Sequence, residues 1–316
     1  MTPWLLSGLG LVILLLAGDS LVKGAVNLSL RLGVPALIVS LTIVAFGTSA
    51  PELLISIQAV LDDVPGLALG NVVGSNTANI LLVLGIPALL ATMHTSECDT
   101  RKTYIYMILA TLLFIGLATR DVFDWIAATV LLGALALVLG DAFRDAHRHR
   151  NASRAMPEEE EPEGADPNLP MWRILIFLAL GLVGLPLGAN LLVDNATIIA
   201  KEYGISDTVI GLTLVAIGTS LPELATTVMA ALRRQADVAL GNVIGSNMFN
   251  LLAIIGVASF VGPIAVDPEF LQFDLWVMLG ASLLLVPFVF LGWNITRVWG
   301  VVLSTLYVGY LVLLLT

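Results

Sequence analysis

Long apolar stretches alternate with short polar breaks along almost the whole chain. A helix needs about 20 apolar residues to cross a hydrocarbon core of about 30 Å, and many of these stretches are long enough. They predict ten membrane-crossing helices, at residues 3–22, 34–60, 66–91, 103–119, 122–143, 171–199, 206–232, 236–262, 270–291 and 295–315. The apolar runs lack the strict alternation of barrel strands, so helices are favoured. We therefore expect an all-α membrane protein.

The ten predicted helices fall into two groups of five. The groups define expected domains at 1–143 and 171–316, joined by a linker over 144–170. The linker is rich in charge and proline, so we expect a spacer that does not fold by itself. Its acidic run, residues 158–166, supplies much of the net charge of -10 and leaves a regulatory or ion-sensing role open.

Composition supports a membrane protein and excludes a soluble globule. Hydrophobic residues make up 58% of the chain and charged residues only 12%, whereas soluble domains carry about 25% charged residues. The single cysteine, Cys98, permits no internal disulfide. We expect the lipid bilayer as a partner, and the sequence suggests neither nucleic-acid binding nor an organic cofactor.

The basic residues predict the orientation. If the ten helices alternate in direction, 12 of the 14 Lys and Arg residues lie on one side, and only Arg120 and Lys201 lie on the other. Basic residues accumulate on the cytoplasmic side of membrane proteins. The linker is therefore expected in the cytoplasm and both termini outside.

The chain contains an internal repeat. A shift of 171 residues superimposes Thr42–Gly85 on Thr213–Gly256 without a gap, and 22 of the 44 positions are identical. Because each half has an odd number of predicted helices, the second copy must run through the membrane in the opposite direction. Inverted repeats of this kind commonly hold a substrate site near the bilayer midplane, between broken helices.

The motif "GTSAPE" at residues 47–52 returns as "GTSLPE" at 218–223, and each copy places a proline and a glutamate inside an apolar segment. The prolines predict broken helices. An ionised glutamate within a membrane is costly and usually functional, and neither segment offers a Lys or Arg within reach of Glu52 or Glu223. Thr48 and Thr219 lie four residues before the glutamates, on the same helical face. Such hard oxygen ligands suit Ca²⁺ or Na⁺.

A second pair of motifs, "GNVVGSNTAN" at 70–79 and "GNVIGSNMFN" at 241–250, adds neutral oxygens. Ser75 shares a helical face with Asn79, as Ser246 does with Asn250. Glycine, serine and asparagine also let helices pack closely in membranes. That alternative carries equal weight for the other asparagines of the two motifs, which are Asn71, Asn76, Asn242 and Asn247.

These paired motifs closely resemble the two alpha-repeats of the cation/calcium exchanger superfamily, in particular the prokaryotic sodium/calcium exchangers. The resemblance extends over nearly the whole chain in layout. It implies ten helices in two inverted halves, with four broken helices around the ions and with the first and sixth helices sliding over the rest. It also implies an integral protein of a prokaryotic plasma (inner) membrane.

The resemblance further implies a ligand set. The family's calcium ligands fall on the carboxylates of Glu52 and Glu223 and on the backbone oxygens of Thr48 and Thr219. Its flanking sodium sites fall on Ala45, Ser49, Ser75, Ala216, Ser220 and Ser246. Members often carry an aspartate at the position of Asn250, opposite Asn79, whereas this chain has asparagine at both positions. The departure leaves two formal negative charges and argues against potassium coupling.

The function expected from these features is antiport of Na⁺ against Ca²⁺ by alternating access, with net charge movement, and not enzymatic catalysis. A proton/calcium antiporter, in which the glutamates bind protons, is the nearest alternative. A passive cation channel could use the same oxygens. An intramembrane hydrolase is disfavoured because the paired motifs contain no His or Lys base.

Overall fold

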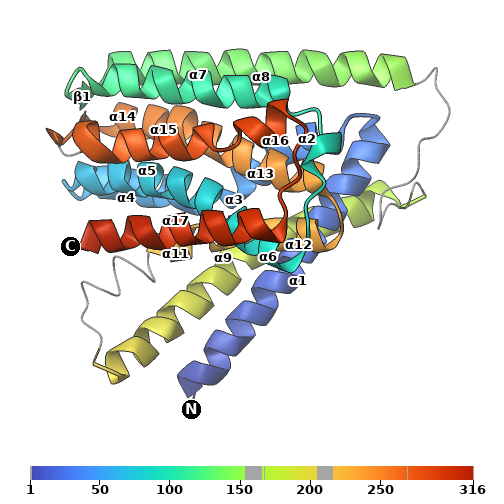
Figure 1. The fold of residues 1–316 in the computed structure, drawn as a ribbon, viewed down its shortest axis with the longest axis horizontal. Coiled ribbons are helices and arrows are strands. Elements are labelled where there is room, and N and C mark those ends of the chain that lie inside the picture. Colours follow the sequence, from blue (N-terminus) through green and yellow to red (C-terminus); the bar gives the residue numbers. More distant parts are fainter. Residues whose placement is uncertain (1, 154–165, 167, 205–215, 269, 316) are drawn as a thin grey trace.

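The computed structural model describes residues 2–153, 166, 168–204, 216–268 and 270–315, and these residues are almost entirely helical (Figure 1). The first half contains α1 (Thr2–Leu32), α2 (Ala36–Val39), η1 (Ser40–Val44), α3 (Ala45–Thr48), α4 (Ala50–Leu61), α5 (Pro65–Leu81), α6 (Gly85–Leu90), η2 (Thr95–Glu97), α7 (Arg101–Ala118), β1 (Val122–Phe123) and α8 (Trp125–Ser153). The second half contains α9 (Met171–Glu202), α11 (Ala216–Thr219), α12 (Leu221–Leu232), α13 (Ala236–Phe249), η4 (Asn250–Ile254), α14 (Ile255–Val261), β2 (Ile264–Ala265), η5 (Phe270–Asp274), α15 (Leu275–Leu283), α16 (Val286–Phe290) and α17 (Arg297–Leu315).

Eight helical stretches in the described part of the chain are long and apolar enough to cross a membrane. Two further helical stretches, residues 36–48 and 50–61, meet at a bend of 42° and would make a ninth crossing if they form one span. The seventh predicted segment, 206–232, lies partly outside the described residues, and its described part contains α11 and α12. The prediction of an all-helical membrane protein is therefore confirmed, whereas the count of ten remains a prediction.

Two pairs of helices dominate the interior. In the most apolar 18-residue stretch of α5–α6, 83% of the residues are buried, and in that of α13–α14, 89% are buried. The other long helices are buried to between 22% and 39%, so they form the outer layer. The repeated motifs at 70–79 and 241–250 thus lie on largely buried helices, where a membrane-embedded site is shielded from lipid.

The helices α1 and α9 pack tightly against each other and run obliquely to the other long helices (Figure 1). Glycines permit the close approach. A Cβ atom on Gly10 of α1 would lie 2.6 Å from the backbone nitrogen of Leu192, and a Cβ on Gly181 of α9 would lie 2.5 Å from the Cβ of Leu21. These two contacts are related by the shift of 171 residues.

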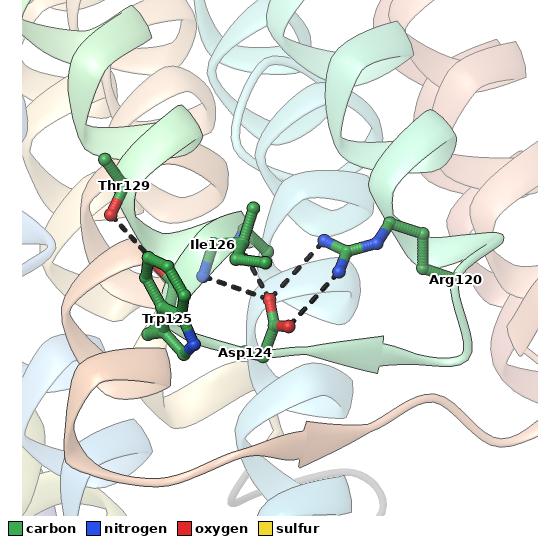
Figure 2. A network of polar contacts seen from close by, with 6 residues as sticks. Arg120, Asp124, Trp125, Ile126 and Thr129 are labelled. Atoms are coloured by element: carbon green, nitrogen blue, oxygen red, sulfur yellow. Dashed lines mark hydrogen bonds and ion pairs between the residues drawn. The ribbon is translucent and has the colours of Figure 1, made fainter.

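The turn between α7 and α8 is fixed by one carboxylate (Figure 2). Asp124 accepts hydrogen bonds from the backbone N–H groups of Ile126 and Ala127, at 3.1 and 3.0 Å, and therefore caps the start of α8. The guanidinium of Arg120 contacts the same carboxylate at 3.1 Å. The hydrogen bond from the Ala127 N–H, and to a smaller extent the Arg120 guanidinium, lowers the pKa of Asp124 below its usual value. Next to this turn, β1 pairs with β2 in antiparallel register.

Helix α8 continues without a break to Ser153, so residues 144–153 of the expected linker are helical. The domain and linker boundaries stay a prediction. The acidic run lies largely in 154–165, outside the described residues.

Candidate functional site

The two repeated glutamates each occupy the first turn of a new helix. Helix α3 ends at Thr48, Ser49 adopts φ −85° and ψ 5°, and α4 begins at the next residue with Pro51 and Glu52 in its first turn. Proline is tolerated there because the first turn has no intrahelical partner for its missing N–H. The break therefore separates two helices at Ser49, and Pro51 does not lie inside a continuous kinked helix.

The second copy has the same local geometry. Ser220 adopts φ −86° and ψ 2°, and Pro222 and Glu223 follow in the first turn of α12. A carboxylate in the first turn interacts favourably with the positive end of the helix dipole. Both glutamates thus lie at helix N-termini, where the dipole attracts a negative charge.

Both glutamates lie in the protein interior and face no lipid. Glu52 is 1% exposed and Glu223 is 0% exposed. The hydroxyl of Ser49 donates to Oε1 of Glu223 at 3.2 Å. Within the described residues, Oε1 and Oε2 of Glu52 and Oε2 of Glu223 have no hydrogen-bond partner, and no Lys or Arg forms an ion pair with either side chain. Buried carboxylates without such partners are very unfavourable unless a cation or a proton compensates them.

Two asparagines hold the glutamate helices against the central helices. Asn71 of α5 donates to the backbone oxygen of Glu52 at 3.4 Å and to the hydroxyl of Ser56 at 3.3 Å. Asn242 of α13 donates to the backbone oxygen of Glu223 at 3.3 Å and to the hydroxyl of Thr227 at 3.2 Å. The repeat therefore reproduces a hydrogen-bond pattern as well as a sequence. The motifs left packing and ion binding equally open for Asn71 and Asn242, and they did not identify Ser56 and Thr227.

A second set of asparagines joins α5 to α13. The amide of Asn76 donates to the backbone oxygen of Asn247 at 3.1 Å, and the amide of Asn247 donates to the backbone oxygen of Asn76 at 3.3 Å. Asn79 donates to Oδ1 of Asn247 at 3.0 Å. These reciprocal bonds fix the two central helices relative to each other and support the packing alternative for Asn76 and Asn247.

The neutral residues that the sequence selected are mostly buried. Thr48 is 1% exposed, and its hydroxyl contacts the backbone oxygen of Ala45 and Oδ1 of Asn242, each at 3.2 Å. Oδ1 of Asn79, Oγ of Ser220 and both amide atoms of Asn250 are buried without a hydrogen-bond partner among the described residues. Ala45, Ser49, Ser75 and Ser246 are also buried, Thr219 is half-buried, and Ala216 begins α11.

The arrangement offers carboxylate, amide, hydroxyl and backbone oxygens in the protein interior, with the carboxylates supplied by both copies of the repeat. Oxygen donors without sulfur or imidazole suit hard cations such as Ca²⁺ and Na⁺. Unpartnered oxygens on Glu52, Glu223 and Asn79 are available to such an ion. The residues therefore fit the predicted cargo chemically.

Comparison with known proteins agrees with this chemistry. The chain matches the family described as sodium/calcium exchanger protein over residues 2–140 and 173–316. It is 36% identical over 342 residues to the sodium/calcium exchanger MaX1 of Methanosarcina acetivorans, which covers 97% of this chain and 96% of that protein. The inner membrane protein YrbG of Escherichia coli is 34% identical over 280 residues, 87% of this chain and 85% of that protein.

Solved structures of the sodium-calcium exchanger NCX_Mj have the same fold. The crystal soaked with 2.5 mM Na⁺ and 1 mM Sr²⁺ matches with a TM-score of 0.83 at 32% sequence identity, and the match covers 99% of this chain and 98% of that one.

Proposed function

This chain belongs to the sodium/calcium exchanger protein family, and on that premise we propose that it is an antiporter that exchanges Na⁺ for Ca²⁺ across a membrane by alternating access. The proposal depends mainly on one observation. Glu52 and Glu223 are buried in the interior without a compensating Lys or Arg among the described residues. A mobile cation is the simplest source of the missing positive charge.

The proposed ligands come from both copies of the repeat. Ca²⁺ binds the carboxylates of Glu52 and Glu223 and the backbone oxygens of Thr48 and Thr219. Amide oxygens of Asn79 and Asn250 add neutral ligands. The proposed sodium sites use oxygens of Ala45, Ser49, Ser75, Ala216, Ser220 and Ser246.

We further propose ten helices arranged as two inverted repeats, 1–143 and 171–316. Support comes from the reciprocal bonds between Asn76 and Asn247 and from the equivalent bonds of Asn71 and Asn242, because each set is related by the same shift of 171 residues. The distribution of Lys and Arg supports a cytoplasmic linker and external termini. A prokaryotic inner membrane is consistent with MaX1 and YrbG, which are archaeal and bacterial proteins.

The proposed exchange is energetically sufficient for calcium export. If three Na⁺ enter for each Ca²⁺, one net charge moves per cycle, which is worth about 2.3 kcal/mol at 100 mV. A tenfold sodium gradient adds about 1.4 kcal/mol per ion. The total of about 6.5 kcal/mol would maintain a Ca²⁺ gradient of between four and five decades.

The test is uptake of ⁴⁵Ca²⁺ into sodium-loaded proteoliposomes. We expect uptake to follow the sodium gradient in the wild type and to fall by at least about 100-fold in Glu52→Gln and in Glu223→Gln. Each change removes a carboxylate proposed to bind Ca²⁺ directly, and even the loss of a residue that only hydrogen-bonds to a metal ligand costs about 10- to 100-fold. Glu202→Gln is the matched control because Glu202 is exposed at the end of α9. Near wild-type uptake in both interior variants would overturn the site assignment.

The same assay separates the alternatives. A proton/calcium antiporter uses the same unpaired carboxylates to bind protons, so its uptake would follow an imposed pH gradient and ignore sodium. A passive channel would conduct Ca²⁺ without any counter-ion gradient.

A further inference from the structure

A cavity of about 420 Å³ lies beside the two glutamate motifs. One part of its wall comes from the motifs themselves, namely Pro51, Gly218, Thr219 and Pro222. Pro51 and Pro222 directly precede Glu52 and Glu223, so the wall contains the sequence neighbour of each proposed carboxylate ligand. The cavity is therefore a suitable approach to the site.

Helix α9 supplies another part of the wall, with three apolar residues, Pro186, Ala189 and Val193, and three polar ones. Asn190, Asp194 and Thr197 line the cavity and lie at positions i, i+4 and i+7 of one helix, so they share a face. Asn190 and Asp194 are exposed. No Lys or Arg in the described ranges forms an ion pair with Asp194. The cavity wall thus carries one uncompensated negative charge.

The equivalent positions in the first repeat have a different charge. Subtracting 171 places Lys23 at the position of Asp194 and Asp19 at the position of Asn190. On α1, Asp19 contacts Lys23 at 3.1 Å and Arg233 at 2.5 Å, so the positive charges outnumber the negative one. The negative charge of the α9 face is therefore not a consequence of the repeat.

Packing also differs between the two halves. Ala189 lines the cavity, whereas its counterpart on α1 is Gly18, where an added Cβ would lie 2.9 Å from the backbone oxygen of Ala225. On the α1 side the helices are in direct contact and leave no space for an ion. The space and the unpaired charge thus coincide on the α9 side.

We propose that Asp194, together with Asn190 and Thr197, forms a cation-capture site in this cavity, which concentrates hydrated Ca²⁺ and Na⁺ before they reach Glu52 and Glu223. The inference rests on the proposed exchange function. The site acts through its electrostatic potential and does not hold the ion in its final coordination. Fixed charge in a confined cleft raises the local concentration of counter-ions and their rate of association.

This mechanism predicts a relation between the two ions. A local potential multiplies the concentration of an ion by a Boltzmann factor whose exponent is proportional to the ion's charge. Neutralising Asp194 should raise the half-saturating concentration of Ca²⁺ by the square of the factor for Na⁺, for example about fourfold against about twofold. Both shifts should vanish near 1 M salt, where the Debye length is about 3 Å.

The experiment attaches charges of opposite sign to one position. Cys98, the single cysteine, is first replaced in Cys98→Ser, and Asp194→Cys is then introduced. Burial and the neighbouring Asp237 raise the pKa of the Cys98 thiol, which makes it a poor background target in any case. Membrane-impermeant thiosulfonates that add a sulfonate or a trimethylammonium group then restore or reverse the charge. Asp267→Cys in the same background is the control, because Asp267 is exposed and does not line this cavity.

We expect the sulfonate adduct at position 194 to restore the low half-saturating Ca²⁺ concentration of the wild type. The trimethylammonium adduct should raise this concentration above that of the unmodified Asp194→Cys protein. Maximal transport rates should not change. The inference would be overturned by equal half-saturating Ca²⁺ concentrations for the two adducts, or by equal shifts for Na⁺ and Ca²⁺. In either case, sodium-dependent uptake by the wild type would still uphold the proposed function. Absence of that uptake in the wild type would overturn both. If Asp194→Cys does not fold, Asp194→Asn tests the same relation between the ions.

Discussion

Adding one methyl group between α1 and α9 should separate the two helices. In Gly10→Ala the new Cβ would lie 2.6 Å from the backbone nitrogen of Leu192 and 2.9 Å from the backbone oxygen of Gly188. Both neighbours are backbone atoms of a long helix, so neither can rotate away. The helices must instead move apart by several tenths of an ångström or more.

A matched control isolates this steric cost. Gly8 lies in the same helix, and a Cβ there would meet nothing within 4 Å among the described residues. Alanine is favoured over glycine in a helix interior by up to about 1 kcal/mol, and this gain is common to both substitutions. Overpacking a close contact costs about 1–3 kcal/mol. We therefore expect Gly10→Ala to be less stable than Gly8→Ala by about 1–3 kcal/mol.

The midpoint of thermal denaturation in detergent measures this difference. At about 2 °C per kcal/mol for a large chain, the two midpoints should differ by roughly 2–6 °C. Gly181→Ala should resemble Gly10→Ala, since its Cβ would lie 2.5 Å from the Cβ of Leu21. Equal midpoints for the alanines at positions 8 and 10 would refute the close packing of α1 against α9.

Three further outcomes can be measured with the same protein. Asn71→Ala and Asn242→Ala should each weaken Ca²⁺ transport about 10-fold, because the glutamate helices lose an anchoring amide, and half-saturating Ca²⁺ concentrations would report the loss. Asp124→Ala should lower the thermal midpoint at pH 7. The Ala127 N–H lowers the folded-state pKa of Asp124, so the stabilisation by this carboxylate is fully present above the unfolded pKa of about 3.9 and is lost as pH falls through the folded value. The thermal midpoints of the wild type and of Asp124→Ala should therefore converge at acid pH. Asn250→Asp places a third carboxylate at a fully buried position, so Ca²⁺ uptake should become dependent on pH or on an added monovalent cation, and flux assays with and without potassium would detect this.

The sequence predicted most helix positions because the apolar stretches are separated by polar breaks. It failed where helical structure continues beyond the apolar segment. Helix α1 was expected to end at residue 22 but continues to Leu32, and residues 24–29 of this extension are buried inside the protein. Hydropathy reports the end of an apolar run, whereas helical stability in a protein comes largely from tertiary packing.

The candidate site was predictable to the extent that its residues repeat. The repeated motif identified Glu52 and Glu223 as candidate ligands, and both side chains are buried. The hydroxyls of Ser56 and Thr227 were missed because they differ between the copies and lie 15 residues from the asparagines that they bind. The ion pair between Asp19 and Arg233 joins residues 214 apart, so no local pattern could have indicated it.

The two halves of the site also differ in a hydrogen bond to the glutamates. The shift of 171 residues relates Ser49 to Ser220 and Glu52 to Glu223. Ser49 donates to Glu223, yet the hydroxyl of its counterpart Ser220 and both carboxylate oxygens of Glu52 have no hydrogen-bond partner in the described ranges. A symmetric arrangement would contain both bonds or neither. If the chain exchanges ions by alternating access between inverted repeats, the state open to the opposite side would interchange the environments of the two halves. The Ser49–Glu223 bond would then open and a Ser220–Glu52 bond would form, so that one carboxylate is partly satisfied by protein in each state while the other is left to the ion.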